Sequence, residues 1–272
     1  MPVQCRIAPS LGSLEGHPNT VWGTVDYTNQ DDAAVFFGLY GLPDFYALWR
    51  HKGKKYILWA GSDIRHFLNG YWLDEKGDIK VLPFDLARWI NKYCESWVEN
   101  EVERDLLLRL GVESQVCPSF MGNIDDYKIS YEANGNYYAS VSGNDFDLYR
   151  WGEIEKLAAK HPGTVFHLYG NTIEWATKNK NVIVHGRVSK EEMNEEVQYM
   201  QGGIRLLPMD GFSEVIAKSV LWGQWPVSAI EYPFVHSIDE IGSDFGPNVE
   251  GRNYYRKTLN AYPWNENYQA TR

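Results

Sequence analysis

The chain has 272 residues, of which 44% are hydrophobic and 23% charged, a composition typical of a folded globular protein and not of a disordered one. Its length suits one large domain or two of about 130 residues each. The formal net charge of −10 is evenly spread, because residues 1–125 carry 12 basic and 17 acidic side chains and residues 126–272 carry 14 and 19. This distribution disfavours a long nucleic-acid backbone as the partner, because proteins that bind one normally present a basic face.

The spacing of the cysteines and the apolar segments indicate the cellular compartment of the protein. Cys5, Cys94 and Cys117 share no close spacing, which gives no sign of a disulfide framework or a zinc knuckle and fits a reducing environment. The N-terminus lacks the charged and apolar regions of a signal peptide, and the longest apolar stretch, residues 33–49, is broken by a proline and an aspartate. We therefore expect a cytoplasmic protein that does not span a membrane.

From about residue 35 onward the sequence alternates short β-branched or aromatic runs with segments of helical period, the pattern of a parallel sheet covered by helices. Ser96 and Glu99 form a Ser-x-x-Glu capping box, which predicts a helix from this point to Gly111. The strands predicted here lie at residues 35–39, 56–59 and 115–118.

A polar stretch rich in Asn, Asp and Gly, residues 121–136, predicts a linker between two domains, which we place at residues 1–124 and 125–272. Strands and helices alternate regularly after it, which predicts a doubly wound sheet. Ser189 and Glu192 form a second capping box. The predicted strands lie at 137–141, 164–169, 182–184, 204–207 and 226–229, and the predicted helices at 148–160, from 189 onward and at 213–223.

The loop of residues 208–214 is the first candidate site, because ligands of open parallel sheets bind beyond the carboxyl ends of the strands. Gly211 lets the backbone approach a ligand, and the N-terminus of the following helix offers unpaired N–H groups to an anion. A phosphorylated or hydroxyl-rich ligand would suit this loop. The alternative is that Asp210 or Ser213 merely caps the following helix.

The segment Val182 to Met193, the strand from Ile204 and the run Asp210-Gly211-Phe212-Ser213 together resemble the donor domain of GT-B glycosyltransferases, closest to the retaining family 4. Other parts resemble the same family in the same order, so that the resemblance covers about residue 35 to the C-terminus. These parts are Trp59 to Ile64, which resembles an acceptor-domain turn, residues 98–119, which resemble the helix and loop ahead of the interdomain linker, and Tyr262-Pro263-Trp264, which resembles the terminal helix.

The resemblance implies an α/β protein of GT-B fold, with two Rossmann-like doubly wound domains facing each other across a cleft. Residues 1–124 would form the acceptor-side domain and residues 125–272 the nucleotide-sugar, or donor, domain with a C-terminal helix. The implied activity is transfer of a sugar from a nucleotide-sugar donor, a UDP- or GDP-sugar, to the hydroxyl of an unidentified acceptor. Retention of configuration and no required cofactor or obligatory metal are also implied, whereas the oligomeric state is left open.

Carried over by position, the Glu-x7-Glu signature of the family falls on Asp210 and Lys218. Asp210 would contact the donor sugar as a catalytic residue, with a shorter reach than Glu. Lys218 cannot accept hydrogen bonds from the ribose, so it either neutralises the diphosphate or, as we favour, points to solvent. Backbone amides of Gly211, Phe212 and Ser213 would hold the sugar and the distal phosphate, and the neighbouring Met209 and Glu214 complete this binding loop.

The family's Arg and Lys after the first donor-domain strand are missing, and Arg150 is the only cation nearby. Arg150 would therefore stabilise the leaving group, with Gly143 in the same loop and Arg187 as further binding residues. On the acceptor side, Asp63 follows a predicted strand and matches a family position as a third catalytic candidate, although it could equally cap the helix that starts at Ile64.

Three alternatives remain open. Asp145 and Asp147 have the Asp-x-Asp spacing by which other glycosyltransferases hold Mg²⁺, although we favour Asp147 as a helix N-cap. The loss of the Arg-Lys pair and the presence of Lys218 also fit a nucleotide-sugar-binding subunit without catalysis. A third possibility is a sugar-nucleotide epimerase or hydrolase on the same fold.

Overall fold

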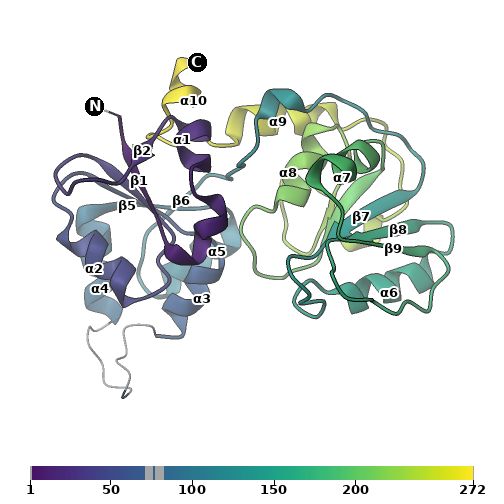
Figure 1. Cartoon of the computed structure of the whole chain (residues 1–272), viewed down its shortest axis with the longest axis horizontal. Coiled ribbons are helices and arrows are strands. Elements are labelled where there is room, and N and C mark those ends of the chain that lie inside the picture. Colours follow the sequence, from purple (N-terminus) through teal and green to yellow (C-terminus); the bar gives the residue numbers. More distant parts are fainter. Residues whose placement is uncertain (1, 71–75, 77–82, 272) are drawn as a thin grey trace. The chain divides into compact units, whose positions relative to one another are not determined.

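The computed structural model describes residues 2–70, 76 and 83–271. The chain divides into two compact units (Figure 1). The first unit consists of residues 1–123, 209–212 and 258–272, and the second unit of residues 124–208 and 213–257. Two segments expected in the C-terminal domain, 209–212 and 258–272, thus lie in the first unit. Among the described residues, no helix has the length and apolar character needed to cross a membrane.

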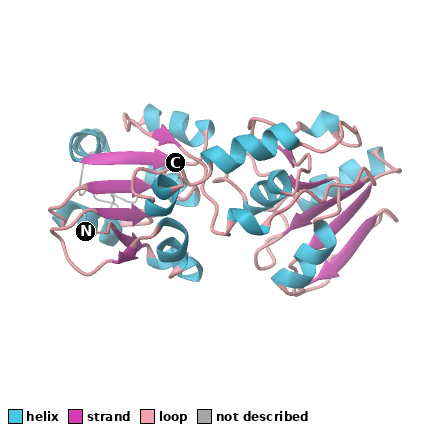
Figure 2. Cartoon of the chain, turned by 90° about the horizontal axis from the view of Figure 1, so that it is seen from above, coloured by secondary structure: helices cyan, strands magenta, loops and turns pink. Residues whose placement is uncertain are grey.

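The first unit is built on a six-stranded parallel sheet with the strand order β2-β1-β3-β4-β5-β6. Helices lie on both faces of the sheet (Figure 2). The strands are β1 (Gln4–Ile7), β2 (Val25–Asp26), β3 (Ala34–Phe37), β4 (Lys55–Leu58), β5 (Cys94–Val98) and β6 (Gln115–Val116), and the helices are η1 (Pro9–Leu14), α1 (His17–Trp22), α2 (Leu42–Arg50), α3 (Ser62–Leu68), α4 (Pro83–Tyr93), α5 (Glu101–Arg109) and α10 (Glu266–Ala270).

Alternate residues of these strands enter two different cores, because successive side chains of a strand point to opposite faces. Phe36 and Ile57 belong to one core cluster, whereas Val35 and Leu58 belong to the other. Both faces are therefore buried, as expected for a doubly wound sheet.

The second of these cores contains residues from the C-terminal segment. Trp264 stacks on Tyr262 with ring centroids 4.4 Å apart and meets Trp97 edge-on at 5.7 Å. The Tyr262 hydroxyl donates to the Cys117 carbonyl at 2.8 Å, and Trp22 donates through Nε1 to Asn260 Oδ1 at 3.2 Å. Segment 258–272 is thus part of the hydrophobic core of the first unit.

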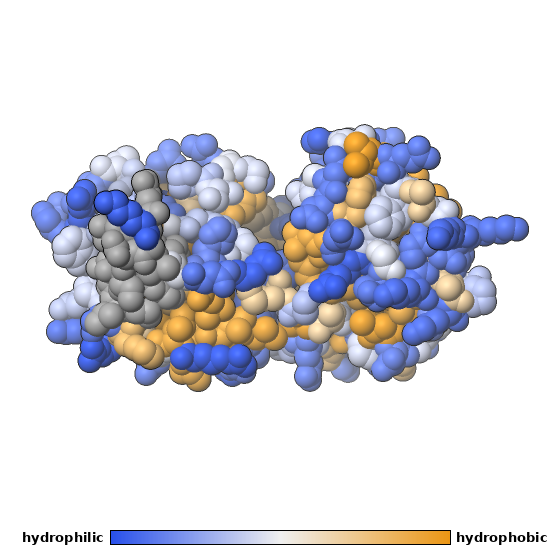
Figure 3. Space-filling view, turned by 90° about the horizontal axis from the view of Figure 1, so that it is seen from below, coloured by the Kyte–Doolittle hydropathy of each residue, from blue (hydrophilic) through white to orange (hydrophobic). Residues whose placement is uncertain are grey.

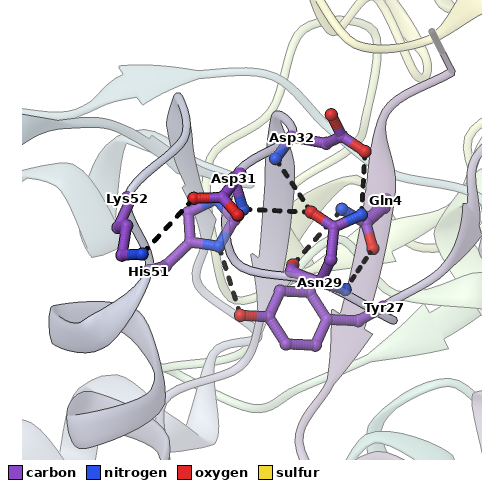
Figure 4. A network of polar contacts seen from close by, with 7 residues as sticks. All are labelled: Gln4, Tyr27, Asn29, Asp31, Asp32, His51 and Lys52. Atoms are coloured by element: carbon purple, nitrogen blue, oxygen red, sulfur yellow. Dashed lines mark hydrogen bonds and ion pairs between the residues drawn. The ribbon is translucent and has the colours of Figure 1, made fainter.

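A polar network connects β1 to the loop before β3 (Figure 4). The side-chain carbonyl of Gln4 accepts hydrogen bonds from the backbone N–H groups of Thr28 and Asn29. Asn29 in turn accepts from the backbone N–H groups of Asp31 and Asp32. The network also reaches the turn before β4, where His51 Nδ1 lies 3.2 Å from the Tyr27 hydroxyl and Lys52 Nζ lies 3.6 Å from Asp31 Oδ1. We assign the network to the stability of these two turns.

The second unit is built on a five-stranded parallel sheet with the strand order β11-β10-β7-β8-β9. The strands β7 to β9 follow one another outward, and the chain then returns to place β10 on the other side of β7. The strands are β7 (Asn136–Ser140), β8 (Val165–Tyr169), β9 (Val182–Gly186), β10 (Gly202–Arg205) and β11 (Val227–Ser228), and the helices are η2 (Ile124–Asp126), α6 (Trp151–Lys160), α7 (Lys190–Val197), α8 (Glu214–Leu221), η3 (Ile238–Glu240) and α9 (Val249–Thr258).

Two local predictions from the sequence are wrong. Ser96 does not cap a helix, because it lies in β5; the helix α5 begins after Asn100, whose side chain accepts from Glu103 N–H. The N-cap of α6 is Arg150 and not Asp147. In both places a buried or turn conformation dictated by the sheet overrides a local capping signal. The predicted N-cap Ser189 is confirmed, and Ser213 caps α8, as the alternative to a binding role predicted.

The surface carries several large apolar side chains among hydrophilic ones (Figure 3). In the first unit, Trp49 of α2 is 55% exposed and Phe84 of α4 is 68% exposed. Single exposed apolar residues are normal in globular proteins.

Candidate functional site

The second unit has a topological switch point between β7 and β10, where the strand order reverses. Ligands of open α/β sheets bind in the crevice outside the carboxyl ends of the strands at such a point. Arg205, the last residue of β10, lies there with its guanidinium 4.6 Å from the ring centroid of Tyr149, which belongs to the loop after β7. The sequence analysis did not single out Arg205; its position at the carboxyl end of a predicted strand was the available signal.

The loop after β7 carries two predicted site residues, Gly143 and Arg150. Gly143 has a φ of +68°, and open space surrounds the position that a Cβ would occupy. Arg150 has a φ of 59°, the left-handed conformation that non-glycine residues seldom adopt, and its side chain is exposed. The turn before it is closed by the Asp145 carboxylate, which accepts from Leu148 N–H at 3.0 Å. Asp145 rather than Asp147 therefore makes the side-chain cap here.

The loops after β7 and β8 are joined by Asn144. Its side chain donates to Thr172 Oγ1 at 2.7 Å and accepts from Thr172 N–H at 2.8 Å. This double hydrogen bond fixes one wall of a pocket of about 650 Å³ at the ends of β8 and β9. The pocket is lined by residues 171–175, 177 and 184–187.

Two polar atoms of this pocket have no hydrogen-bond partner among the described residues. Asn171, which is 5% exposed, donates through Nδ2 to the Ile173 carbonyl, but its Oδ1 has no partner. The indole N–H of Trp175 is also buried and unpartnered. Buried polar groups are normally satisfied, so an orphan acceptor and an orphan donor in one pocket indicate a polar ligand. Arg187, a predicted binding residue, lies exposed on the rim of the same pocket.

Lys218 is buried in α8, and the expectation that it points to solvent is wrong. Only 5% of the residue is exposed, and its Nζ donates to Asn194 Oδ1 of α7 at 3.3 Å. Burial lowers the pKa of Lys218, partly offset by the charge of Glu214. A buried ammonium that donates to a neutral amide creates positive potential between α7 and α8. Ser213 accepts from Val215 N–H as the N-cap of α8, and Glu214 is exposed in its first turn.

The predicted binding loop 209–212 lies in the first unit, at the carboxyl ends of β4 and β5. The Asn100 side chain donates to the Asp210 carbonyl at 2.7 Å, and Phe212 N–H donates to Glu99 Oε2 at 2.7 Å. A Cβ on Gly211 would lie 2.0 Å from Glu99 Oε2. Gly211 is therefore required by close packing against this carboxyl group.

Glu99 and Glu103 form a buried carboxyl pair beneath this loop, which the sequence analysis missed because it placed Glu99 in a capping box. Glu99 accepts a hydrogen bond from the Ser119 hydroxyl, and Glu103 Oε2 accepts from Glu99 N–H at 2.9 Å. Burial, together with the charges of Asp210 and Asp63, raises the pKa of Glu99 to about 8. Burial and the neighbouring Glu99 raise the pKa of Glu103 as well. We therefore expect the pair to retain a proton at neutral pH.

Asp63 is fully buried in the same unit. Its carboxylate accepts from Leu39 N–H at 2.8 Å and from Ala60 N–H at 2.9 Å, and burial raises its pKa to about 6. Asp63 thus holds together the loops that follow β3 and β4. Its proposed catalytic role stays a prediction, because the side chain is enclosed by these loops in this conformation.

Comparison with known structures identifies the fold. No protein-family model matches the sequence, and no curated protein matches it. The structure of HepE from Anabaena in complex with UDP and glucose matches 100% of this chain and 99% of its own, with 9% identity and a TM-score of 0.56. The galactosyltransferase WaaB of the lipopolysaccharide outer core matches 99% and 98%, with 10% identity and a TM-score of 0.54. The chain has the GT-B fold.

The GT-B fold predicted from sequence is thus confirmed. Other GT-B structures are longer. The chain covers 53% of a mutant of S. aureus TarM crystallised with UDP, at 16% identity and a TM-score of 0.49, and so spans about half of that protein. Within the second unit, Gly143 and Arg150 follow β7 and Arg187 follows the edge strand β9, so all three lie on the side of the carboxyl ends of the strands. Asp63 and residues 209–212 lie in the first unit.

Proposed function

We propose that this protein is a glycosyltransferase that binds a nucleotide-sugar donor at the carboxyl edge of the second unit's sheet and transfers the sugar to an acceptor hydroxyl. The observation that carries the proposal is the pocket beside β8 and β9, where the Asn171 acceptor and the Trp175 donor lack partners. A nucleobase offers donors and acceptors on one edge and a flat apolar face, which suits these two groups and the indole ring.

Cations near the pocket would hold the diphosphate. Arg187 lies on the pocket rim, Arg205 ends β10, and Arg150 ends the loop after β7, so that Arg205 and Arg150 belong to the two segments beside the switch point. Guanidinium groups bind phosphate oxygens in a bidentate manner and remain charged. Arg205 would therefore stabilise the leaving group in place of the Arg-Lys pair that is missing after β7.

In the proposed reaction, the donor's glycosidic bond to the diphosphate breaks, the acceptor oxygen forms the new bond to the sugar, and the hydroxyl proton passes to the departing diphosphate. Arg150 and Arg205 neutralise the charge that develops on the leaving diphosphate. Lys218 contributes positive potential through α8. We further propose retention of configuration and no obligatory metal, with the acceptor being a small or lipid-linked hydroxyl compound rather than a polyanion.

Calorimetric titration with UDP, GDP, ADP and CMP, each with and without Mg²⁺, tests the donor site. We test UDP first because HepE, which shares the fold, binds UDP and glucose. We expect micromolar binding of one nucleotide, weakened at least about tenfold by Arg205→Ala or Arg187→Ala, which corresponds to about 1.4 kcal/mol. Lys160→Ala is the matched control, because this exposed cation lies at the other end of α6.

The outcomes separate the alternatives. Binding that requires Mg²⁺ and is lost in Asp145→Asn would assign the diphosphate site to the Asp-x-Asp pair. Binding without turnover of any nucleotide sugar would favour a binding subunit, and release of free sugar or an isomer without an acceptor would favour a hydrolase or epimerase. If none of the four nucleotides bound, the donor-site proposal would be wrong.

A further inference from the structure

Three potential metal ligands meet on one face of the second unit's sheet. His167 lies in β8, His185 in β9 and Glu196 in α7, and one ligand atom from each lies within 4.8 Å of the others. His167 Nδ1 is 2.8 Å from His185 Nε2 and 3.5 Å from Glu196 Oε1. His185 Nδ1 is 3.8 Å from Glu196 Oε2.

The placement of these residues is not what packing alone would produce. Phe166, Leu168 and Val182 of the same strands face the apolar core on the side of α6. Figure 1 shows α7 on the face of the sheet opposite α6. His167 and His185 lie close to Glu196 of α7. A helix packed on a parallel sheet normally covers apolar side chains. Here it covers two imidazoles and contributes a carboxylate of its own.

The backbone brings His185 into this position. Leu168 pairs with Val184 and Tyr169 pairs with Gly186, so His185 is the extra residue of an irregularity in β9. Such a bulge re-aims a side chain and often occurs near functional sites. The ring of Tyr169 stacks on His185 at a centroid distance of 4.3 Å and an interplanar angle of 12°, which holds the imidazole in one orientation.

The chemistry of the set suits a transition metal. Two histidines and one glutamate supply the nitrogen and oxygen ligands of open zinc sites, whose fourth position takes water or a substrate. Ligand atoms around a tetrahedral Zn²⁺ lie about 3.3 Å apart, since each bond is about 2.0 to 2.1 Å. The separations from His167 Nδ1, 2.8 Å to His185 Nε2 and 3.5 Å to Glu196 Oε1, bracket this value, and one ligand atom of each residue lies within 4.8 Å of the others. Small rotations of the side chains would therefore suffice.

A buried hydroxyl next to the cluster has no partner among the described residues. Tyr169 is 1% exposed, and its hydroxyl makes no hydrogen bond. A water molecule in the fourth coordination position would give the orphan hydroxyl a partner.

We propose that His167, His185 and Glu196 bind a divalent transition metal ion, with Zn²⁺ as the preferred ion. The metal connects the edge strand β9 to α7. One of its ligands, His185, also lines the pocket of about 650 Å³. The site differs from the Asp145 and Asp147 pair, whose carboxylates suit Mg²⁺. It does not depend on the proposed transferase activity, because its ligands are defined by their own geometry.

Titration of the metal-free full-length protein with Zn²⁺ and with Co²⁺ tests the site. We expect one Zn²⁺ per chain, and for Co²⁺ the visible absorption bands of a four-coordinate site. Glu196→Gln keeps the size of a side chain that is 43% exposed, so folding is preserved, and it should weaken Zn²⁺ binding at least about tenfold. His185→Asn should abolish it. His161→Ala, at a histidine of the same unit outside the cluster, should bind as the unaltered protein does.

A second readout does not depend on affinity. Zn²⁺ should raise the unfolding temperature of the unaltered protein, reversibly on addition of a chelator, and Mg²⁺ at the same concentration should not. Equal Zn²⁺ binding in Glu196→Gln and the unaltered protein would overturn the proposal. So would the absence of both Zn²⁺ binding and Co²⁺ absorption, and the contact between the two rings would then be a hydrogen bond between neutral imidazoles.

Discussion

Glu99 is a single carboxyl group whose environment links the stability of the first unit to pH. Its pKa of about 8 lies above the ordinary value of 4.5, because burial disfavours the charged form. Between these two values the unfolded chain has released the proton and the folded chain retains it. Stability should therefore fall as pH rises from about 4.5 to 8, by at most about 1.4 kcal/mol per pH unit for one proton.

Replacing Glu99 by glutamine should reduce this slope. A neutral amide cannot ionise, and its Oε1 can still accept a hydrogen bond from Phe212 N–H. Removing the Glu99 charge also removes one cause of the raised pKa of Glu103. Urea unfolding midpoints measured from pH 5 to 9 provide the test, with Glu113→Gln at an exposed glutamate of the same unit as the control. An identical pH dependence in Glu99→Gln and the unaltered protein would show that the pair carries no extra proton.

Arg150 separates the cost of a backbone conformation from the benefit of a charge. A non-glycine residue in the left-handed region costs on the order of 1 kcal/mol, which glycine avoids. Arg150→Gly should therefore raise the unfolding free energy by up to about 1 kcal/mol while weakening nucleotide binding. Thermal unfolding and nucleotide titration of the same preparation give both numbers. Arg150→Lys, which retains a charge but keeps the strain, serves as the control; tight nucleotide binding by the glycine variant would remove Arg150 from the site.

At the scale of elements, the regular alternation of strands and helices made the second unit predictable. Each of its predicted strands overlaps an observed one, because apolar β-branched runs between capped helices leave few alternatives. The strand β5 was missed because Ser96 and Glu99 satisfy the spacing of a capping box, and only pairing with β4 shows that Ser96 lies inside the sheet.

Residues of the candidate site were predictable only where their position after a predicted strand was sufficient to identify them. Gly143 and Arg187 follow strands in the sequence, and the carboxyl edge of a parallel sheet collects such residues. The burial of Lys218 depends on the packing of α7 against α8, and the pairing of Glu99 with Glu103 depends on loop 209–212 returning to the first unit. Neither contact has a signal in local spacing.

Loop 209–212 meets Glu99, the residue after β5, at a distance that leaves no room for a Cβ on Gly211. Gly211→Ala would place a methyl group 2.0 Å from Glu99 Oε2, and the buried glutamate has little room to move. We expect a loss of about 1 to 3 kcal/mol in unfolding free energy, measured by denaturant titration. Gly152→Ala in α6 is the matched control, because no atom lies within 4 Å of its added Cβ, and it should be neutral or slightly stabilising. Equal stability of the two variants would contradict the close approach.

At the scale of the whole molecule, the two units should respond differently to loss of the C-terminal aromatic residues. Trp264 is 1% exposed and packs against Tyr262, Trp97 and Tyr56 of the first unit. Trp264→Ala should destabilise this unit by about 3 to 5 kcal/mol. Hydrogen exchange should then show loss of protection in β3 and β4 but not in β7 and β8. Trp49→Ala, at a 55% exposed tryptophan, is the control. Uniform loss of protection in both sheets would show that the units unfold as one.

The membership of residues 258–272 in the first unit affects the order of events during synthesis. A ribosome releases β1 to β6 long before it releases Tyr262 and Trp264, which complete one of the two cores of their sheet. Domains usually fold in the order in which they emerge. Here the second unit is the first to have all of its residues available. Until residues 258–272 are synthesised, Trp22, Trp97 and one face of the first unit's sheet stay uncovered. The first unit is therefore the part of the nascent chain most in need of a chaperone.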